Sequence, residues 1–247
     1  NIAGKNFRRY FSALTKIDKK NIYSVMQVYF INKISAGDNS LNKDFLKFML
    51  DMLKFNVLSH KESDHIDLNL YRNILILCTM EREIGTLKKF ISNYIRFVDI
   101  NSRESILAYS NSHLSFLQGK FQKALELSNN INFNDLLNST KDNLYFKNDI
   151  KTLTLRSLYE LNAFESAISF IDAYKHFLRN SKLMKEEMRS NYLFFVNSVS
   201  ELIRLRNRPD EFAFKKFKSR LNSSKFTGAK WVLEKLNEVE SNYTSQL

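Results

Sequence analysis

The chain has 247 residues, of which 44% are hydrophobic, so it can bury a sizeable core. It holds five glycines and one proline, which disfavours all-β and Rossmann-like folds, because their tight turns use such residues repeatedly. The net charge of +12 makes an acidic partner or nucleic acid worth weighing. A single cysteine excludes an internal disulfide framework.

The same features suit a protein of a reducing compartment, and we expect a cytoplasmic location. The longest uncharged stretches are too short or too polar to cross a bilayer, so we expect no transmembrane segment. Because the sequence opens on Asn1 rather than Met, we also expect the native N-terminus to lie upstream.

Apolar residues recur at the three- and four-residue intervals of an amphipathic helix along almost the whole chain, as in the stripe from Leu87 to Val98. We expect one helix to end near Pro209, the next to begin with Asp210 at its N-cap, and a division near Ser223. In chain order, the spacing predicts helices over 5–20, 21–35, 40–57, 66–83, 85–98, 102–118, 120–130, 143–161, 164–179, 184–206 and 210–240.

The breaks between these helices are mostly short, which predicts that consecutive helices lie antiparallel to one another, as in bundles and α-solenoids. The loosest segment, 129–142, is polar and rich in asparagine, and it is interpreted as an insertion between two repeats. No linker rich in Pro, Ser or Gly divides the chain. We therefore expect residues 1–247 to form a single elongated domain of helical repeats.

Residues 108–125 resemble a tetratricopeptide (TPR) motif, with a small residue in a first helix, Gly-x-Phe at a turn and Ala-Leu in a second helix. Ser112 and Ala124 are small, so two helices can cross closely at these positions. Gly119 can adopt the positive φ of a helix C-terminus, and Phe121 can close the open end of the pair.

Residues 155–168 resemble a second copy of the motif, in which Asn162 takes the glycine position and Leu155 replaces the small residue. Asn tolerates a left-handed backbone better than most residues do. A weaker third copy spans 80–91 and contains Gly85. The segments 159–180 and 231–236 also resemble the C-terminal part of uncharacterised TPR-like proteins from AT-rich bacteria.

The resemblance implies an all-α fold, a right-handed α-solenoid of antiparallel helix pairs with degenerate repeats. Its clearest repeats would be 102–130 and 143–179, and residues 184–240 would form capping helices. It implies a non-catalytic scaffold that mediates protein–protein interaction, with another protein or a peptide segment as the partner. The helix face that would line a peptide groove carries Tyr109, His113, Arg156, Tyr159 and Glu160.

Signatures of enzymes are missing from the sequence, which has no phosphate-binding glycine loop, no HExxH, no GxSxG and no kinase motif set. His60 and His65 lie with Asp64 and Asp67 on one polar segment, and a solvated loop accounts for them better than a metal site. Cys78 lies in an apolar run and is interpreted as a buried small residue. We therefore expect no enzyme activity, no metal and no cofactor.

Nucleic-acid binding remains an alternative, because basic residues gather near the C-terminus. On a helix, Phe214 and Phe217 share one face while Lys215 and Lys218 share another, which is typical of a core with a solvated surface. Lysine-rich composition also fits an AT-rich genome, so the alternative is not favoured. The basic residues are Arg204, Arg206, Arg208, Lys215, Lys216, Lys218, Arg220, Lys225 and Lys230.

Overall fold

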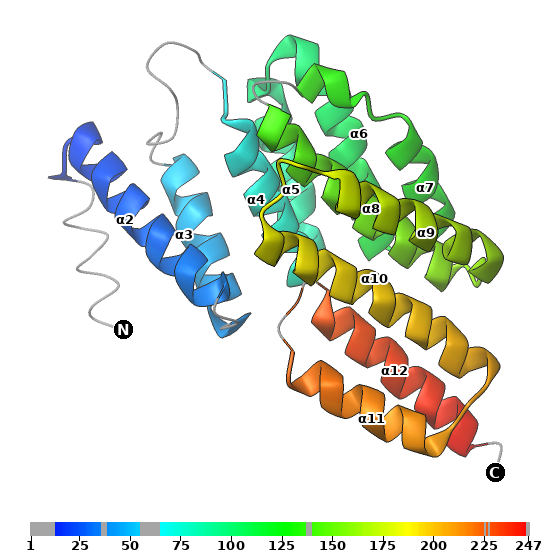
Figure 1. Cartoon of the computed structure of the whole chain (residues 1–247). Helices are drawn as coiled ribbons and strands as arrows, with labels where there is room; N and C mark the ends of the chain where they lie inside the picture. Colours follow the sequence, from blue (N-terminus) through cyan, green and yellow to red (C-terminus); the bar gives the residue numbers. More distant parts are fainter. Residues whose placement is uncertain are drawn as a thin grey trace. The chain divides into compact units, whose positions relative to one another are not determined.

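In the described ranges the chain consists of eleven α-helices and three short 3-10 helices, with no β-strand, so the predicted all-α class is confirmed (Figure 1). None of these helices combines the length and the apolar character that a bilayer span requires. The chain divides into two compact units, Asn1–Leu117 and Gln118–Leu247. The computed structural model describes residues 13–35, 39–54, 65–136, 140–224, 226 and 228–245.

The first unit is built from helices that pack on their neighbours in the chain. Helix α3 packs on α2 and α4, and α4 packs on both α5 and α6. The centre of this packing is apolar, with Met49, Tyr71, Ile74, Leu75 and Leu87 buried completely. The elements are α2 (Lys16–Ser35), η1 (Asn39–Leu41), α3 (Asn42–Lys54), α4 (Leu68–Met80), α5 (Ile84–Tyr94), η2 (Ile95–Phe97) and α6 (Ile100–Leu117).

Helix α2 corrects one sequence prediction, because it continues through the break expected between 20 and 21. Its start is set by Thr15, whose hydroxyl oxygen accepts a hydrogen bond from the backbone amide of Asp18 at 3.2 Å. The same hydroxyl donates to the Asp18 carboxylate at 2.6 Å. No glycine or proline follows within the helix to end it. The start of the predicted helix 5–20 lies outside the described residues.

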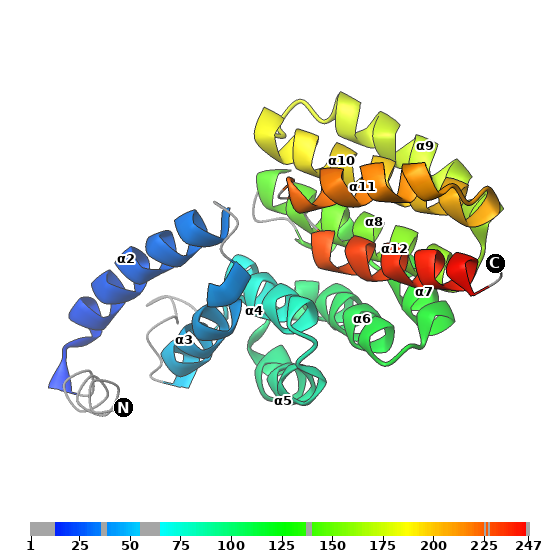
Figure 2. The same cartoon turned by 90° about the horizontal axis from the view of Figure 1, so that it is seen from below.

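The second unit continues the same kind of packing. Helix α8 contacts α7 and α9, α10 contacts α9 and α12, and α11 contacts α12 (Figure 2). One apolar core runs through α8 to α12 and includes Leu155, Tyr174, Phe195, Leu202 and Val232. The elements are α7 (Phe121–Asn129), η3 (Phe133–Leu136), α8 (Thr140–Glu160), α9 (Phe164–Asn180), α10 (Glu186–Asn207), α11 (Glu211–Asn222) and α12 (Ala229–Thr244).

Two expectations about the C-terminal helices are confirmed. Asp210 is the N-cap of α11, and its carboxylate accepts a hydrogen bond from the backbone amide of Ala213. The division near Ser223 separates α11 from α12, and Gly228 begins α12 with a φ of +82°. A Cβ at Gly228 would lie 3.0 Å from the ring of Phe195, so both the backbone angle and the close approach favour glycine.

Three turns share one backbone geometry, and each has a residue with positive φ, at Arg82 (φ 56°), Gly119 (φ 73°) and Asn162 (φ 56°). A helix begins two residues after each of them, at Ile84, Phe121 and Phe164. The residue between has nearly the same conformation each time, with ψ of 64° at Glu83, 63° at Lys120 and 60° at Ala163. Five residues after each turn residue lies a completely buried side chain, which is Leu87, Ala124 or Ala167.

Hydrogen bonds close two of these turns in the same way. At the end of α4, the amide of Glu83 donates to Cys78 and that of Arg82 to Thr79, at 2.9 and 3.3 Å. At the end of α8, the amide of Ala163 donates to Leu158 and that of Asn162 to Tyr159, at 3.0 Å each. Both are Schellman closures, which satisfy the last carbonyl groups of a helix.

The positive φ expected at Gly119 and tolerated at Asn162 is confirmed, but the break predicted between 83 and 85 lies earlier, at residues 81–83. Gly85 lies inside α5, because the helix already begins at Ile84. The turn residue is Arg82, which adopts a left-handed backbone although its Cβ makes this unfavourable. The unit boundary after Leu117 falls within the predicted repeat 102–130, and the single elongated domain stays a prediction.

The left-handed turn can be tested at Asn162, whose side chain is exposed. Replacing Asn162 with Val should lower the free energy of unfolding by about 1–2 kcal/mol, because a β-branched residue is strained at positive φ. Urea unfolding followed by circular dichroism measures the change. Asp172, exposed in the middle of α9, is the control, since Asp and Val have similar helix propensities and Asp172→Val should change little. Equal losses for both variants would contradict the turn.

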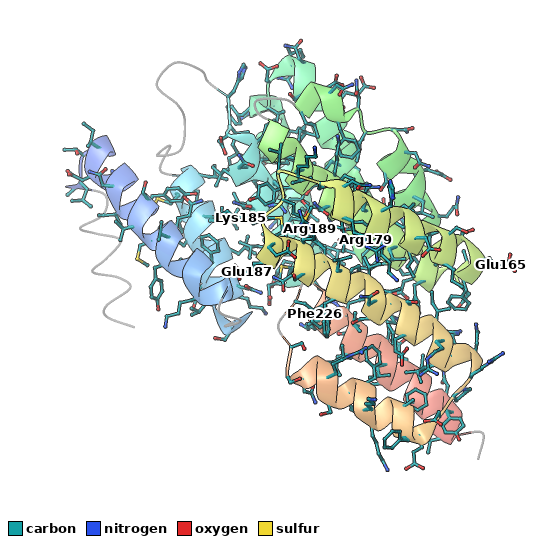
Figure 3. The ribbon with its side chains drawn as sticks, viewed as in Figure 1. Glu165, Arg179, Lys185, Glu187, Arg189 and Phe226 are labelled. Carbon is teal, nitrogen blue, oxygen red and sulfur yellow. The ribbon has the colours of Figure 1, made fainter. Side chains whose placement is uncertain are left out.

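Arg189 closes the loop between α9 and α10, and it lies near the start of α10 beside Lys185 and Glu187 (Figure 3). Its Nε donates to the carbonyl of Leu178 at 3.1 Å. Its Nη2 donates to two further carbonyl groups of the loop, those of Ser181 at 3.1 Å and Met184 at 3.3 Å. Nη1 pairs with the carboxylate of Glu186. One guanidinium thus donates to one carbonyl group in the last turn of α9 and to two carbonyl groups of the loop that follows it.

Replacing Arg189 with Met should therefore lower the free energy of unfolding by about 2 kcal/mol, because partly buried carbonyl groups lose their donors. Arg179, also labelled in Figure 3, is exposed on α9 and offers a matched Arg→Met control. The control should stay within about 0.5 kcal/mol of the original protein. A loss at Arg189 no larger than at Arg179 would show that the loop does not depend on these hydrogen bonds.

Candidate functional site

The five residues predicted to line a groove lie on two helices in different units. Tyr109 and His113 belong to α6 in the first unit, and Arg156, Tyr159 and Glu160 belong to α8 in the second. Each group is described within its own unit. That the five residues bind a peptide stays a prediction.

Tyr109 and His113 are both buried, with 0% and 3% of their surfaces exposed. Their rings meet edge to face with centroids 4.8 Å apart. The Nδ1 atom of His113 lies 3.4 Å from the hydroxyl of Thr79, which in turn donates to the carbonyl of Leu75 at 2.9 Å. These two side chains therefore have packing and hydrogen-bonding roles inside the first unit.

Arg156, Tyr159 and Glu160 gather around Trp231 of α12. The indole Nε1 of Trp231 donates to the carboxylate of Glu160 at 2.7 Å. The ring of Tyr159 stands edge-on to the indole with centroids 5.3 Å apart, and the Arg156 guanidinium lies 5.2 Å above the indole centroid. Three of the predicted residues thus lie together on α8, and each of them contacts Trp231 of α12.

Lys235 of α12 completes this cluster. Its Nζ lies 3.0 Å from the Glu160 carboxylate and 2.9 Å from that of Glu238, and the side chains of Lys235 and Glu160 are 14% and 15% exposed. Burial alone would lower the pKa of Lys235, but the two carboxylates outweigh it and hold that pKa above 10.5. We call Arg156, Tyr159, Glu160, Trp231 and Lys235 the tryptophan cluster.

The cluster also borders the start of α9 and the end of α10. Phe164 stands edge-on to Tyr159, with centroids 5.7 Å apart, and the Arg206 guanidinium lies 5.2 Å above the Phe164 ring. Burial raises the pKa of the Tyr159 hydroxyl, and the charge of Arg206 offsets part of that rise. The cluster therefore joins α8 and α12 beside the exposed guanidinium of Arg206. The Glu160 carboxylate already binds Trp231 and Lys235.

Sequence reasoning missed the parts that α12 contributes. Trp231 follows Glu160 by 71 positions, so no local spacing pattern connects them. The unusual residue type was a signal, because Trp231 is the only tryptophan and a buried indole N–H normally finds an acceptor. Nothing in the sequence identified Glu160 as that acceptor.

The polar segment considered for metal binding is described only in part, because His60 and Asp64 lie outside the described residues. The carboxylate of Asp67 caps α4 by accepting from the amide of Leu70 at 2.8 Å, while His65 lies 3.4 Å from Asp99. In the described ranges no three His, Cys, Asp or Glu side chains are grouped to hold a metal. Cys78 is buried as expected, and burial raises the pKa of its thiol to about 12.

Several basic residues near the C-terminus are paired within their own unit. The Arg204 guanidinium binds Glu201 at 2.7 and 2.9 Å. Lys215 pairs with Glu211 at 2.6 Å, and Lys218 pairs with Glu240 of α12 at 2.9 Å. Arg220 lies over the rings of Phe194 and Phe217. Because a phosphate approaching these cations would also meet their carboxylates, the pairing weighs against a continuous nucleic-acid track here.

Comparison of the chain with protein families, with curated proteins and with solved structures gives no match. The resemblance to TPR proteins therefore stays a prediction made from the residues of the two copies. The geometry of the turns and of the tryptophan cluster stands on the structure alone.

The tryptophan cluster can be tested through Lys235. Replacing Lys235 with Met should lower the free energy of unfolding at pH 7 by about 2 kcal/mol, because Glu160 loses its cation. The folded state raises the pKa of Lys235, so its contribution is complete below 10.5 and disappears as the pH rises through the raised value. The difference between the variant and the original protein should therefore shrink only in strong alkali.

Trp231 fluorescence follows both unfolding and the local environment, since the chain has one tryptophan. Lys230, exposed at the start of α12, provides the matched Lys→Met control, which should change stability by less than about 0.5 kcal/mol. A pH-independent difference, or one that shrinks already near neutral pH, would contradict the role assigned to Lys235.

Proposed function

We propose that the chain is a non-catalytic, TPR-like helical-repeat scaffold that binds a segment of another protein. In this proposal the consecutive helices are antiparallel pairs of a right-handed solenoid. The single observation that carries it is the turn at Arg82, Gly119 and Asn162, which recurs with the same backbone conformation and the same buried position five residues later. A turn that recurs along a chain is typical of solenoids, whose stacked repeats present extended binding surfaces.

The roles of the polar side chains support a scaffold rather than an enzyme. Glu160 holds Trp231 and Lys235, and the raised pKa of Cys78 keeps its thiol protonated near neutral pH. Asp67 and Asp210 serve as helix caps. These groups thus stabilise helix ends and helix contacts, and the proposal assigns the binding role to the outer surfaces of the helices.

Large apolar side chains on those surfaces give sites at which a partner can be detected. Leu107 of α6, Ile168 of α9 and Phe212 of α11 are 38%, 48% and 75% exposed. A photo-reactive phenylalanine analogue at such a position replaces an exposed apolar group, so folding should be preserved. The three positions sample both units, and none of them belongs to the tryptophan cluster.

Each of the three variants should be expressed in the cell from which the protein comes and irradiated there. A scaffold predicts discrete, protease-sensitive adducts with another protein from at least one position, and a different yield at each position. Adducts that nuclease removes would instead support nucleic-acid association. Protein adducts from none of the three positions would contradict the proposed function.

A further inference from the structure

A cationic and aromatic surface is formed by residues of η3, α8 and α9. Lys147 and Lys151 are one helical turn apart on α8, so they share a face of that helix. The Nζ of Lys147 lies 5.7 Å from the ring centroid of Phe133. The Nζ of Lys151 lies 5.5 Å from the centroid of Phe170 and 4.8 Å from that of Phe177. We call these five residues the lysine–aromatic face.

The two ammonium groups differ from Arg204, Lys215 and Lys218, because neither forms an ion pair within the described part of the chain. Burial lowers the pKa of Lys151, and the neighbouring charge of Lys147 lowers it further. This direction is the one expected of a half-buried cation with a like charge beside it and no carboxylate to compensate. Asp149, between them in sequence, is buried. Burial raises the pKa of the Tyr174 hydroxyl, and the negative charge of Asp149 contributes to that rise.

The aromatic rings hold the lysines without neutralising them. A cation over a ring is attracted by the ring quadrupole, but the ring accepts no conventional hydrogen bond from the ammonium group. Each ammonium has three N–H donors, so donors remain for an anion. Phe133, Phe170 and Phe177 are themselves only half-buried, which leaves apolar surface beside the charges. An anionic ligand with apolar groups would complement both features.

We propose that the lysine–aromatic face binds an acidic segment of a partner protein, whose carboxylates pair with Lys147 and Lys151 and whose apolar side chains cover the rims of Phe170 and Phe177. The inference rests on the proposed scaffold function and specifies one binding surface and the chemistry of its partner. Carboxylates at neighbouring positions match two cations one helical turn apart. Binding would supply a counter-charge that the described side chains of the second unit do not provide at this face.

Nucleic acid fits the same face less well. Affinity for a nucleic acid grows with the number of phosphates neutralised, and this face offers two cations. Sequence-tolerant binding of single strands also uses free aromatic faces on which bases stack. The ammonium group of Lys151 already lies over both Phe170 and Phe177. The surface therefore favours carboxylates and apolar side chains over phosphates and bases.

The test is a binding titration of the full chain with a fluorescein-labelled peptide of alternating Glu and Phe, followed by fluorescence anisotropy at low salt. The double variant K147E/K151E reverses both charges. The control K215E/K216E changes the net charge equally on the exposed surface of α11. A second variant, K147M/K151M, removes the charges without repulsion, and circular dichroism with thermal unfolding checks that all variants fold. Probes with Gln in place of Glu, and single-stranded RNA of similar length, complete the set.

The proposal expects K147E/K151E to weaken binding of the Glu peptide at least about tenfold and K147M/K151M to weaken it several-fold. The K215E/K216E control should remain within about threefold, because a net-charge effect alone is weak and screened. Equal losses in the two charge-reversed variants, equal binding of the Gln probe, or tighter binding of RNA through the same lysines would each overturn it. Protein adducts in photo-cross-linking together with any of these results would reject this face and leave the scaffold function standing.

Discussion

The architecture depends on how a helix can end and the next one begin within three residues. Arg82, Gly119 and Asn162 each place one residue in the left-handed region. For a residue with a Cβ, this conformation costs about 1–2 kcal/mol, so the surroundings must compensate. The compensation is visible at Asn162, where backbone hydrogen bonds close the end of α8 and Ala167 is buried completely one turn into α9. The turn and the packing that follows it thus stabilise each other.

A second constraint operates between helices distant in sequence. Trp231 and Lys235 of α12 both bind the Glu160 carboxylate near the end of α8, so one side chain satisfies an indole donor and a half-buried cation. Glu160 lies two residues before Asn162, so it couples the position of α12 to the α8–α9 turn. The second unit is therefore stabilised by the local turn at Asn162 and by the long-range contact of Glu160 with α12. Both lie at the end of α8.

Local signals allowed two of the three turns to be predicted from sequence. Gly119 and Asn162 are residue types that adopt positive φ, and the helical periodicity on both sides of them was clear. Arg82 has no such preference, and its turn arises from two backbone hydrogen bonds and the burial of Leu87. The predicted helices 66–83 and 85–98 therefore placed this break after its actual position.

The candidate site was predictable only in part for a related reason. Periodicity puts Arg156, Tyr159 and Glu160 on adjoining positions of one helix, but it cannot tell that α12 brings Trp231 against them. Likewise, the basic composition near the C-terminus drew attention to cations such as Lys215 and Lys218, which the structure pairs with carboxylates. Lys147 and Lys151 carry no sequence signal of their own, because the rings beneath them come from η3 and α9.

The most direct measurement of the repeated turn is a crystal structure of the whole chain. The account predicts positive φ at Arg82, Gly119 and Asn162, helices beginning two residues after each, and α8 and α9 running antiparallel with Ala167 between them. A helical φ at Arg82 or Asn162, or an α9 that continues the direction of α8, would contradict it.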